Sequence, residues 1–200
     1  MKKNTWFLGL FFTMTVGAHA GNPKNAVNVT VEVFRISQWN YETNSKLSDT
    51  DYYYYLKEGA TREKKSLFAS VSALTRSGEK VVSESAKELT FVDNIVDGKA
   101  VWKTEKIGVG FVVQPSINAS ETEIDLPYQF WFTENLVRSM TLVDGNRDAF
   151  TKPVLYKLNV TNVMTLAPNR VKKIFVQNRE EGDGNAPFLV GFLKTSIVSP

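Results

Sequence analysis

The stretch of residues 107–132 constrains the fold of this chain more than any other segment. It reads IGVGFVVQPSINASETEIDLPYQFWF, two apolar-rich halves joined by a polar turn. We expect a β-hairpin with a break at Gln114-Pro115 and a turn through Asn118-Ala119-Ser120. The pattern leaves open whether the apolar face meets lipid, a neighbouring subunit or the protein's own core. In the second half an apolar side chain recurs at every other position, as in a strand with one buried face: Ile124, Leu126, Tyr128, Phe130 and Phe132.

Strand patterns also occupy most of the chain on either side of this hairpin. Residues 27–34 alternate cleanly, and polar turns such as Asp97-Gly98 and Asp144-Gly145-Asn146 separate the later segments. Loops are expected over residues 38–46 and from the second of these turns to Pro153. The sequence therefore predicts a mainly β fold with one short helix, built as a single domain over residues 21–200. The remaining strands are expected near residues 67–74, 80–89, 89–96, 137–143, 154–166, 171–176 and 188–198.

The one expected helix begins after Ser48. This residue can cap the helix, with Asp51 three positions later as in a capping box, and Gly59 is expected to end it. The run Tyr52-Tyr53-Tyr54-Tyr55 lies on this helix. Four consecutive helical residues point around most of the circumference, so they cannot form one flat stacking surface for a ligand. The run is interpreted as helix packing with some exposed hydroxyl groups.

Residues 1–20 have the features of a secretory signal peptide. Lys2 and Lys3 precede an apolar run, and small residues end the segment at Ala18-His19-Ala20. A membrane anchor would need about 20 uninterrupted apolar residues, and Thr13, Thr15 and Gly17 interrupt this run. We therefore expect cleavage after Ala20 and an exported protein.

The residue inventory excludes much of the usual chemistry of sites. His19 is the only histidine, it lies in the leader, and the chain has no cysteine. A Ser-His-Asp or Cys-His system, an imidazole or thiolate metal site and a disulfide framework are therefore excluded from the mature chain. The formal charge falls from +3 to +1 when Lys2 and Lys3 are removed, and the run Arg62-Glu63-Lys64-Lys65 is too short and mixed to indicate an anionic partner. We expect a protein that is not an enzyme, with no metal, cofactor or nucleic-acid partner.

Two acidic clusters are weighed as sites. Glu181, Asp183 and Asn185 alternate with glycines as in a calcium loop, but the glycine after the third ligand and the distal Glu are missing, which favours an ordinary turn. A second cluster lies at the tip of the central hairpin. A solvated tip does not raise the pKa of one carboxyl above another, so acid–base catalysis is not expected there. Its members are Glu121, Glu123 and Asp125.

The order of the sequence blocks resembles the C-terminal domain of bacterial secretins. Secretins are the outer-membrane channel proteins of type II and type III secretion and of type IV pilus systems. In this chain a VTVEV strand is followed by a helix opening LSD, by LFASVSALTRSGEK, by IGVGFVVQPSI, and by a closing pair of blocks. The blocks lie at residues 29–33, 47–49, 67–80, 107–117, 153–163 and 188–193, which span nearly the whole mature chain.

The resemblance implies a short, solitary secretin-like β domain without the small N-terminal ring-building domains. It implies a structural component of a secretion or pilus-assembly system that forms homo-oligomers through its β-edges. The expected partners are other copies, other secretion or pilus proteins and the outer membrane, in the periplasm or outer membrane of a Gram-negative bacterium. A soluble periplasmic module that captures a protein partner by a strand edge is the alternative. The family motif implies structural roles for Gly78, Gly108, Gly110, Pro115 and Gly191.

Overall fold

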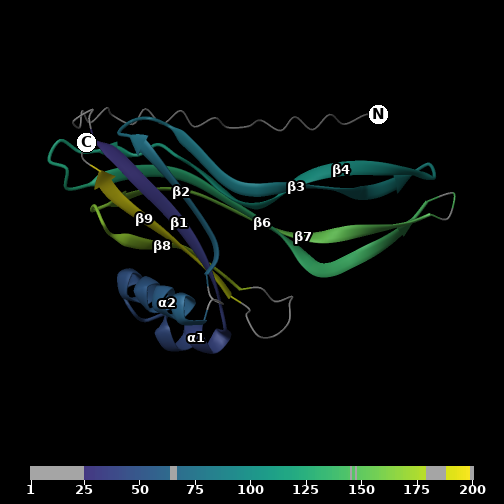
Figure 1. Ribbon diagram of the computed structural model, residues 1–200, viewed down its shortest axis with the longest axis horizontal. Helices are drawn as coiled ribbons and strands as arrows, with labels where there is room; N and C mark the ends of the chain where they lie inside the picture. The colour runs from purple at the N-terminus through teal and green to yellow at the C-terminus, as the bar shows by residue number, and fades with distance from the viewer. Residues whose placement is uncertain (1–24, 64–66, 145, 147, 179–187, 199–200) are drawn as a thin grey trace, which may run out of the picture.

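The computed structural model describes residues 25–198 apart from 64–66, 145, 147 and 179–187 (Figure 1). The prediction of a mainly β fold is confirmed, with two helices instead of one. The predicted signal peptide, residues 1–20, and the acidic cluster at residues 181–185 lie outside the described residues. The elements are β1 (Ala26–Ile36), α1 (Gln38–Asn44), α2 (Asp49–Glu63), β2 (Leu67–Arg76), β3 (Val81–Val96), β4 (Lys99–Val113), β5 (Ser116–Ile117), β6 (Ile124–Val143), β7 (Ala149–Leu166), β8 (Val171–Asn178) and β9 (Phe188–Val198).

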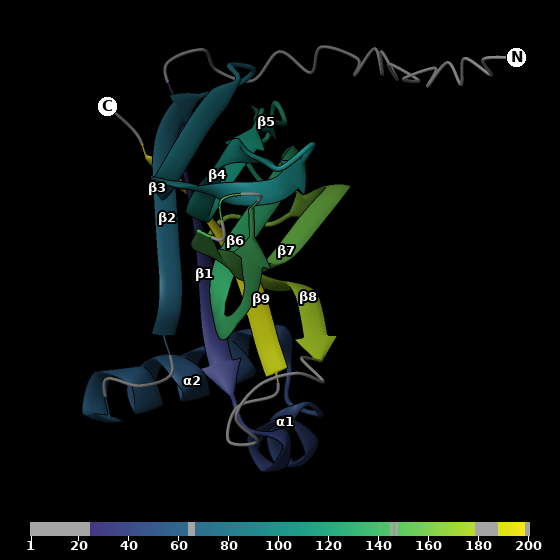
Figure 2. The ribbon, with the colours of Figure 1, turned by 90° about the vertical axis from the view of Figure 1, so that its right-hand side faces the viewer.

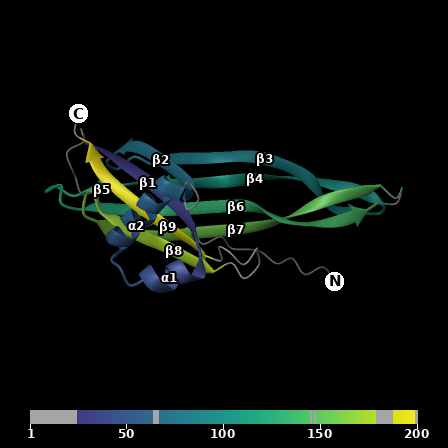
Figure 3. The same ribbon diagram turned by 60° about the horizontal axis from the view of Figure 1, so that its bottom comes forward.

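The strands form two antiparallel sheets. The four-stranded sheet has the order β2-β1-β9-β8. The five-stranded sheet has the order β3-β4-β6-β7, and β5 pairs with β6 next to the end of β4 (Figure 3). The break at Gln114-Pro115 separates β4 from β5, as the sequence predicted. The central hairpin is also confirmed, because residues 108–113 of β4 pair with residues 128–133 of β6.

The main core lies between the two sheets. Alternate valines of β1 point into it and meet the apolar face of the central hairpin. Phe130, fully buried there, stacks on Phe175 with ring centroids 5.4 Å apart. The apolar face of the central hairpin therefore packs in the protein's own core. The residues of this face and of β1 are Val27, Val29, Val31, Val33, Val109, Phe111, Val113, Ile124, Leu126, Tyr128, Phe130 and Phe132.

A second core lies on the opposite face of the four-stranded sheet, where the helices pack (Figure 2). Tyr52, Tyr53 and Leu56 of α2 are buried against aromatic side chains of β1 and β9, including Phe192. Glu32 of β1 accepts hydrogen bonds here from the Tyr53 hydroxyl and from Lys57. The tyrosine run is thus divided between core and surface, as expected for helix packing.

Three expected loops or ends were wrong. Residues 38–44 form a helix because the Ser37 hydroxyl accepts a hydrogen bond from the Asn40 N–H and Tyr41 stacks on Phe188. Helix α2 continues past Gly59, since an interior glycine costs only about 1 kcal/mol and the buried side chains before it fix the helix. Strands β6 and β7 include residues 134–143 and 149–153, because they pair with each other on both sides of a register shift between Asn135 and Ser139.

Candidate interaction surface

The five-stranded sheet extends far beyond the four-stranded one as two long hairpins (Figure 1). We call this extension the arm; it comprises residues 86–107 of β3–β4 and residues 134–157 of β6–β7. The ladder between β4 and β6 ends at the pair Gly108–Thr133. Beyond it, within the described residues, each hairpin has main-chain pairing only between its own two strands.

Gly108 marks the point where the arm leaves the core. Its φ is +143°, a region that favours glycine, and a Cβ there would lie 2.2 Å from the Ser85 carbonyl oxygen and 2.7 Å from the Ala86 Cα. The main chain of β3 thus lies so close to β4 at this point that a residue with a Cβ would not fit at position 108. The glycine is therefore a structural part of the junction between core and arm.

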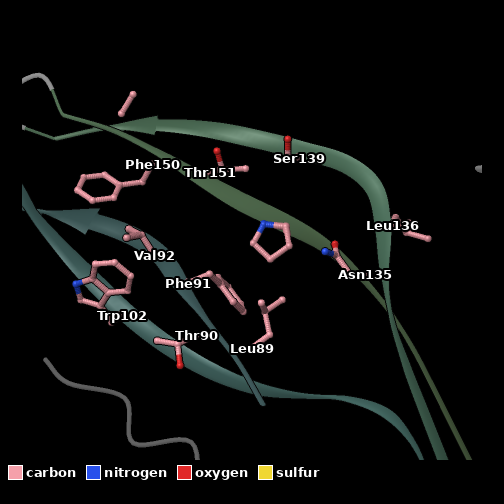
Figure 4. A pocket seen from close by; sticks show the side chains of 12 residues that line it. Leu89, Thr90, Phe91, Val92, Trp102, Asn135, Leu136, Ser139, Phe150 and Thr151 are labelled. Carbon is pink, nitrogen blue, oxygen red and sulfur yellow. The ribbon is translucent and has the colours of Figure 1, made fainter. Parts of the chain in front are cut away.

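The two hairpins of the arm face each other across a cleft of about 580 Å³ that is lined by both apolar and polar side chains (Figure 4). Trp102 of β4 and Phe150 of β7 meet edge to face across it, with ring centroids 6.0 Å apart. Phe91 and Val92 are buried at its floor. The cleft is lined by Leu89, Thr90, Phe91, Val92, Trp102, Asn135, Leu136, Ser139, Ala149, Phe150, Thr151 and Pro153.

Ion pairs join the same two hairpins. Lys152 Nζ of β7 lies 2.9 Å from Asp93 Oδ1 of β3 and 2.5 Å from the Asp93 carbonyl oxygen. Lys157 Nζ of β7 lies 2.7 Å from Glu105 Oε2 of β4, whose other oxygen pairs with Lys103 at 2.9 Å. The hydrogen bond from Lys152 lowers the pKa of Asp93, and those from Lys157 and Lys103 lower the pKa of Glu105. The arm therefore holds charged carboxylates and ammonium groups at neutral pH.

Both edges of the five-stranded sheet are long and open. In the described part of the chain no strand pairs with the outer edge of β3, which has 16 residues, or of β7, which has 18. Open edges of this length present rows of unpaired N–H and C=O groups and are templates for another chain. The side chains along β3 from Glu84 to Glu88 are exposed, and so are Asn159 and Thr161 of β7.

The arm also carries exposed apolar side chains toward its tip. Trp102 is 61% exposed, and one face of the tip thus offers a large aromatic ring to its surroundings. Exposed apolar residues near polar ones mark contact surfaces when they gather in one place. The others in the arm are Val96, Val101, Met140 and Val143.

The glycines and the proline that the family motif singles out lie in the core and at its border. Gly78, with φ +84°, turns β2 into β3, and its N–H donates to the Pro115 carbonyl at 2.6 Å, so these two residues are brought together. A Cβ at Gly110 would lie 2.5 Å from the Trp131 ring, and one at Gly191 would lie 2.1 Å from the Phe175 ring. Their positions are those of close-packing residues, and Gly191 lies apart from the others on β9.

The acidic tip of the central hairpin is hydrogen-bonded and exposed. Glu121 accepts from Asn25 Nδ2 at 2.7 Å, and Asp125 accepts from the Thr165 hydroxyl at 2.6 Å. Among the described residues no group of His, Cys, Asp and Glu side chains could hold a metal ion. Neither described helix, α1 nor α2, has the length and apolar content that crossing a bilayer requires.

Sequence reasoning missed the cross-arm contacts. Lys152 and Phe150 fell in an expected loop, and their partners Asp93 and Trp102 lie 59 and 48 residues away in the chain. One signal was present in the sequence: residues 81–90 are strand-like but carry polar side chains on both faces. A strand with polar side chains on both faces does not pack against a core on either face. Such a strand is typical of a sheet edge or of an extension beyond the core.

Comparisons with known proteins were made on both sequence and structure. No family model and no curated protein matches the sequence. Three solved secretin structures are similar in fold: PilQ of the V. cholerae type IV competence pilus, InvG of the Salmonella SPI-1 type III secretion injectisome, and PulD of the Klebsiella pneumoniae type II secretion system outer membrane complex. Their identities to this chain are 11%, 9% and 10%, with TM-scores of 0.44, 0.46 and 0.46.

The matched segments cover 87%, 88% and 88% of this chain but only 57%, 62% and 38% of the three neighbours' chains. The chain thus spans less than two thirds of the length of each secretin. The three neighbours are secretins, the family whose C-terminal domain the order of the sequence blocks resembles.

Proposed function

We propose that this protein is a secretin-like structural component of a bacterial envelope, acting in a secretion or pilus-assembly system by forming a homo-oligomeric ring. The observation that carries the proposal is the pair of long open edges on one sheet, β3 and β7. An unprotected edge of 16 or 18 residues is an aggregation hazard in a monomer. Pairing each edge with the next copy removes both edges at once.

The strand directions favour a ring over a simple dimer. β3, β4, β6 and β7 alternate in direction, so β3 and β7 run opposite to each other. When copies are related by rotation about an axis along the sheet, β7 of one copy meets β3 of the next in antiparallel orientation. Such a contact joins two different surfaces, and it closes into a ring when the rotation closes. A two-fold dimer through β7 would leave both β3 edges open.

The proposed setting is the envelope of a Gram-negative bacterium, reached through the predicted signal peptide. The arm is the part proposed to contact the outer membrane, since its exposed apolar side chains include Trp102 and Met140. Trp at the boundary between polar and apolar surroundings is the usual pattern at a membrane interface. The four-stranded sheet and its helices remain on the periplasmic side in this proposal.

The test of the ring is the mass of the mature chain in buffer and in detergent, by light scattering and electron microscopy. We expect a closed oligomer in detergent, and a stable monomer in both conditions would refute the ring. Two proline variants on β7, Thr161→Pro and Asn162→Pro, sharpen the test. Consecutive residues of a strand point their N–H groups to opposite sides, so one variant removes an outward donor and the other breaks the ladder to β6.

The melting temperature of each monomeric variant tells the two apart. The variant that lacks only the outward N–H donor melts near the wild-type temperature, whereas the variant with a broken ladder melts lower. The variant that lacks only the outward donor should lose assembly while keeping the fold. Normal assembly by this well-folded variant would contradict pairing through the β7 edge.

A second candidate function is the capture of an extended partner peptide, and one observation favours it. A cleft of about 620 Å³ lies where β3 diverges from β2, lined by Phe68, Ser70, Ala86, Lys87 and Phe132 among others. The β2 edge at this cleft is not paired with β3 in the described residues. An added strand could use it, as in β-augmentation. A protein fully released by osmotic shock, monomeric in detergent, would favour this candidate over the ring.

A further inference from the structure

The two open edges of the arm are in contact with each other within one copy. In a flat four-stranded sheet β3 and β7 would be about 14 Å apart, three strand spacings. Here β3 and β7 touch, because the arm is curled so that its two hairpins face each other. The contact is made by side chains, since no main-chain pairing between β3 and β7 occurs in the described residues.

The side chains that make this contact act on the edge itself. Asp93 is the extra residue of a bulge in β3, where the register to β4 skips between Val92 and Asn94. A bulge bends its strand and re-aims the side chain. Lys152 of β7 pairs with the Asp93 carboxylate and also donates to the Asp93 carbonyl, so it occupies a main-chain acceptor of β3.

Two further contacts hold the hairpins together. Lys157 of β7 pairs with Glu105 of β4 near the base of the arm, and Trp102 meets Phe150 near the tip. The apolar residues Phe91 and Val92, which line the cleft between the hairpins, are buried in the closed arm. We call these three cross-arm contacts, Asp93–Lys152, Glu105–Lys157 and Trp102–Phe150, the clasp.

We infer that the clasp is an autoinhibitory contact, which holds β7 against the β3–β4 hairpin of the same copy, with Lys152 on a main-chain acceptor of β3, until a second copy replaces it. The inference rests on the proposed function, because the partner that opens the clasp is another copy of this chain. Exposed ion pairs are individually weak, so the clasp can open without unfolding the core. The open arm exposes Phe91 and Val92 together with both edges, which favours immediate pairing with the next copy.

The first arm of the test reverses charges. The double variant Lys152→Glu with Lys157→Glu places like charges across both ion pairs, and we expect it to assemble roughly tenfold faster than wild type, or more. The swap Asp93→Lys with Lys152→Glu restores an opposite pair and should return the wild-type rate. Lys106→Glu is the matched control, because Lys106 pairs with Glu84 at 2.7 Å within one hairpin and should leave the rate unchanged.

The second arm of the test locks the clasp. The chain has no cysteine of its own, so Asp93→Cys with Lys152→Cys can be joined by a bismaleimide linker that contains a cleavable disulfide. The locked arm should stay monomeric in detergent, and it should assemble once the linker is reduced. Thr90→Cys with Thr104→Cys is the control, since these residues are directly opposite within the β3–β4 hairpin and should not block assembly.

Each outcome decides one question. Assembly of the locked arm at the wild-type rate overturns the clasp, as does a charge-reversed variant that assembles no faster than wild type. If every variant stays monomeric, the proposed ring fails, and the clasp is then judged by binding of the apolar dye ANS to the monomers. Greater ANS binding by the charge-reversed variant than by wild type and the swap supports the clasp, and equal binding overturns it.

Discussion

The core and the arm of this protein use the same strands in opposite ways. In the core, β4, β6 and β7 cover a second sheet and bury Phe111, Phe130 and Phe132 almost completely. In the arm, the continuations of the same strands have solvent or a shallow cleft on their faces and ion pairs between them. The core is stabilised by apolar burial, which no partner needs to complete. The arm has open edges and weak side-chain contacts, so it is the part that another molecule can complete.

The largest expected difference is in the response to loss of an aromatic ring. Phe130→Ala removes a fully buried ring and should lower the free energy of unfolding by about 3–5 kcal/mol. Trp102→Ala in the arm should lower it by at most about 1 kcal/mol, because the ring is mostly exposed. Denaturant unfolding of both variants measures this. Equal losses would mean that the arm is part of the cooperative core.

The next effect concerns the attachment of the helices to the core. Tyr53→Phe removes a hydrogen bond to the buried Glu32 carboxylate and should cost about 1.5–3 kcal/mol. Tyr55→Phe is the matched control. Tyr55 lies two residues further along the same helix with an exposed side chain, and its replacement should change the free energy of unfolding by less than about 0.5 kcal/mol. Thermal and urea unfolding compare the two. A neutral Tyr53→Phe would contradict the role of this contact in holding α2.

The junction between core and arm should be sensitive to a single methyl group. Gly108→Ala forces a Cβ against main chain of β3 at a positive φ and should cost about 1–3 kcal/mol. Gly59→Ala is the control, since a Cβ there meets no atom within 4 Å, and in a helix it should stabilise by about 0.5–1 kcal/mol. Opposite signs in the unfolding free energies are expected. If Gly108→Ala does not lower the free energy of unfolding, β3 and β4 are not packed as closely at the junction as this structure places them.

The smallest effect is a pH dependence confined to the arm. The pKa values of Asp93 and Glu105 are lowered in the folded protein by Lys152, Lys157 and Lys103. Their contribution is therefore fully present above the ordinary carboxyl pKa and is lost as the pH falls through the lowered values. We expect ANS binding to the monomer to rise in that acidic range. A Lys152→Gln, Lys157→Gln variant should lack the transition, and an unchanged transition in it would assign the effect to other groups.

The sequence predicted the core well because its alternation is strong. The period of two from Ile124 to Phe132 and the valines of β1 identified the buried faces and the central hairpin without any knowledge of pairing. The strands at residues 134–136 and 149–153 were not predicted, and 137–143 was expected only as a separate short strand, since a strand without a core shows no alternation of apolar and polar side chains. The helix at 38–44 was missed although its Ser37 cap is local, because the segment is polar and its stacking on Phe188 depends on distant packing.

The candidate surface was only partly accessible from the sequence. Which strands lie at the edges of the sheet depends on the strand order. The alternation of apolar and polar residues identifies each strand but not its neighbours. The clasp depends on contacts such as Asp93–Lys152 between residues 59 positions apart. These contacts arise from a bulge and from the curl of the arm, and neither leaves a local pattern in the sequence.

Hydrogen–deuterium exchange of residues 21–200 as a monomer and in detergent tests most directly whether the arm is completed by other copies. We predict slow exchange in the core under both conditions, and faster exchange along β3 and β7 of the arm in the monomer. In detergent, β3 and β7 should both become protected, while α1 and α2 stay unchanged. Protection gained on the helices or β8 but not on β3 and β7, or no change at all, would contradict the account.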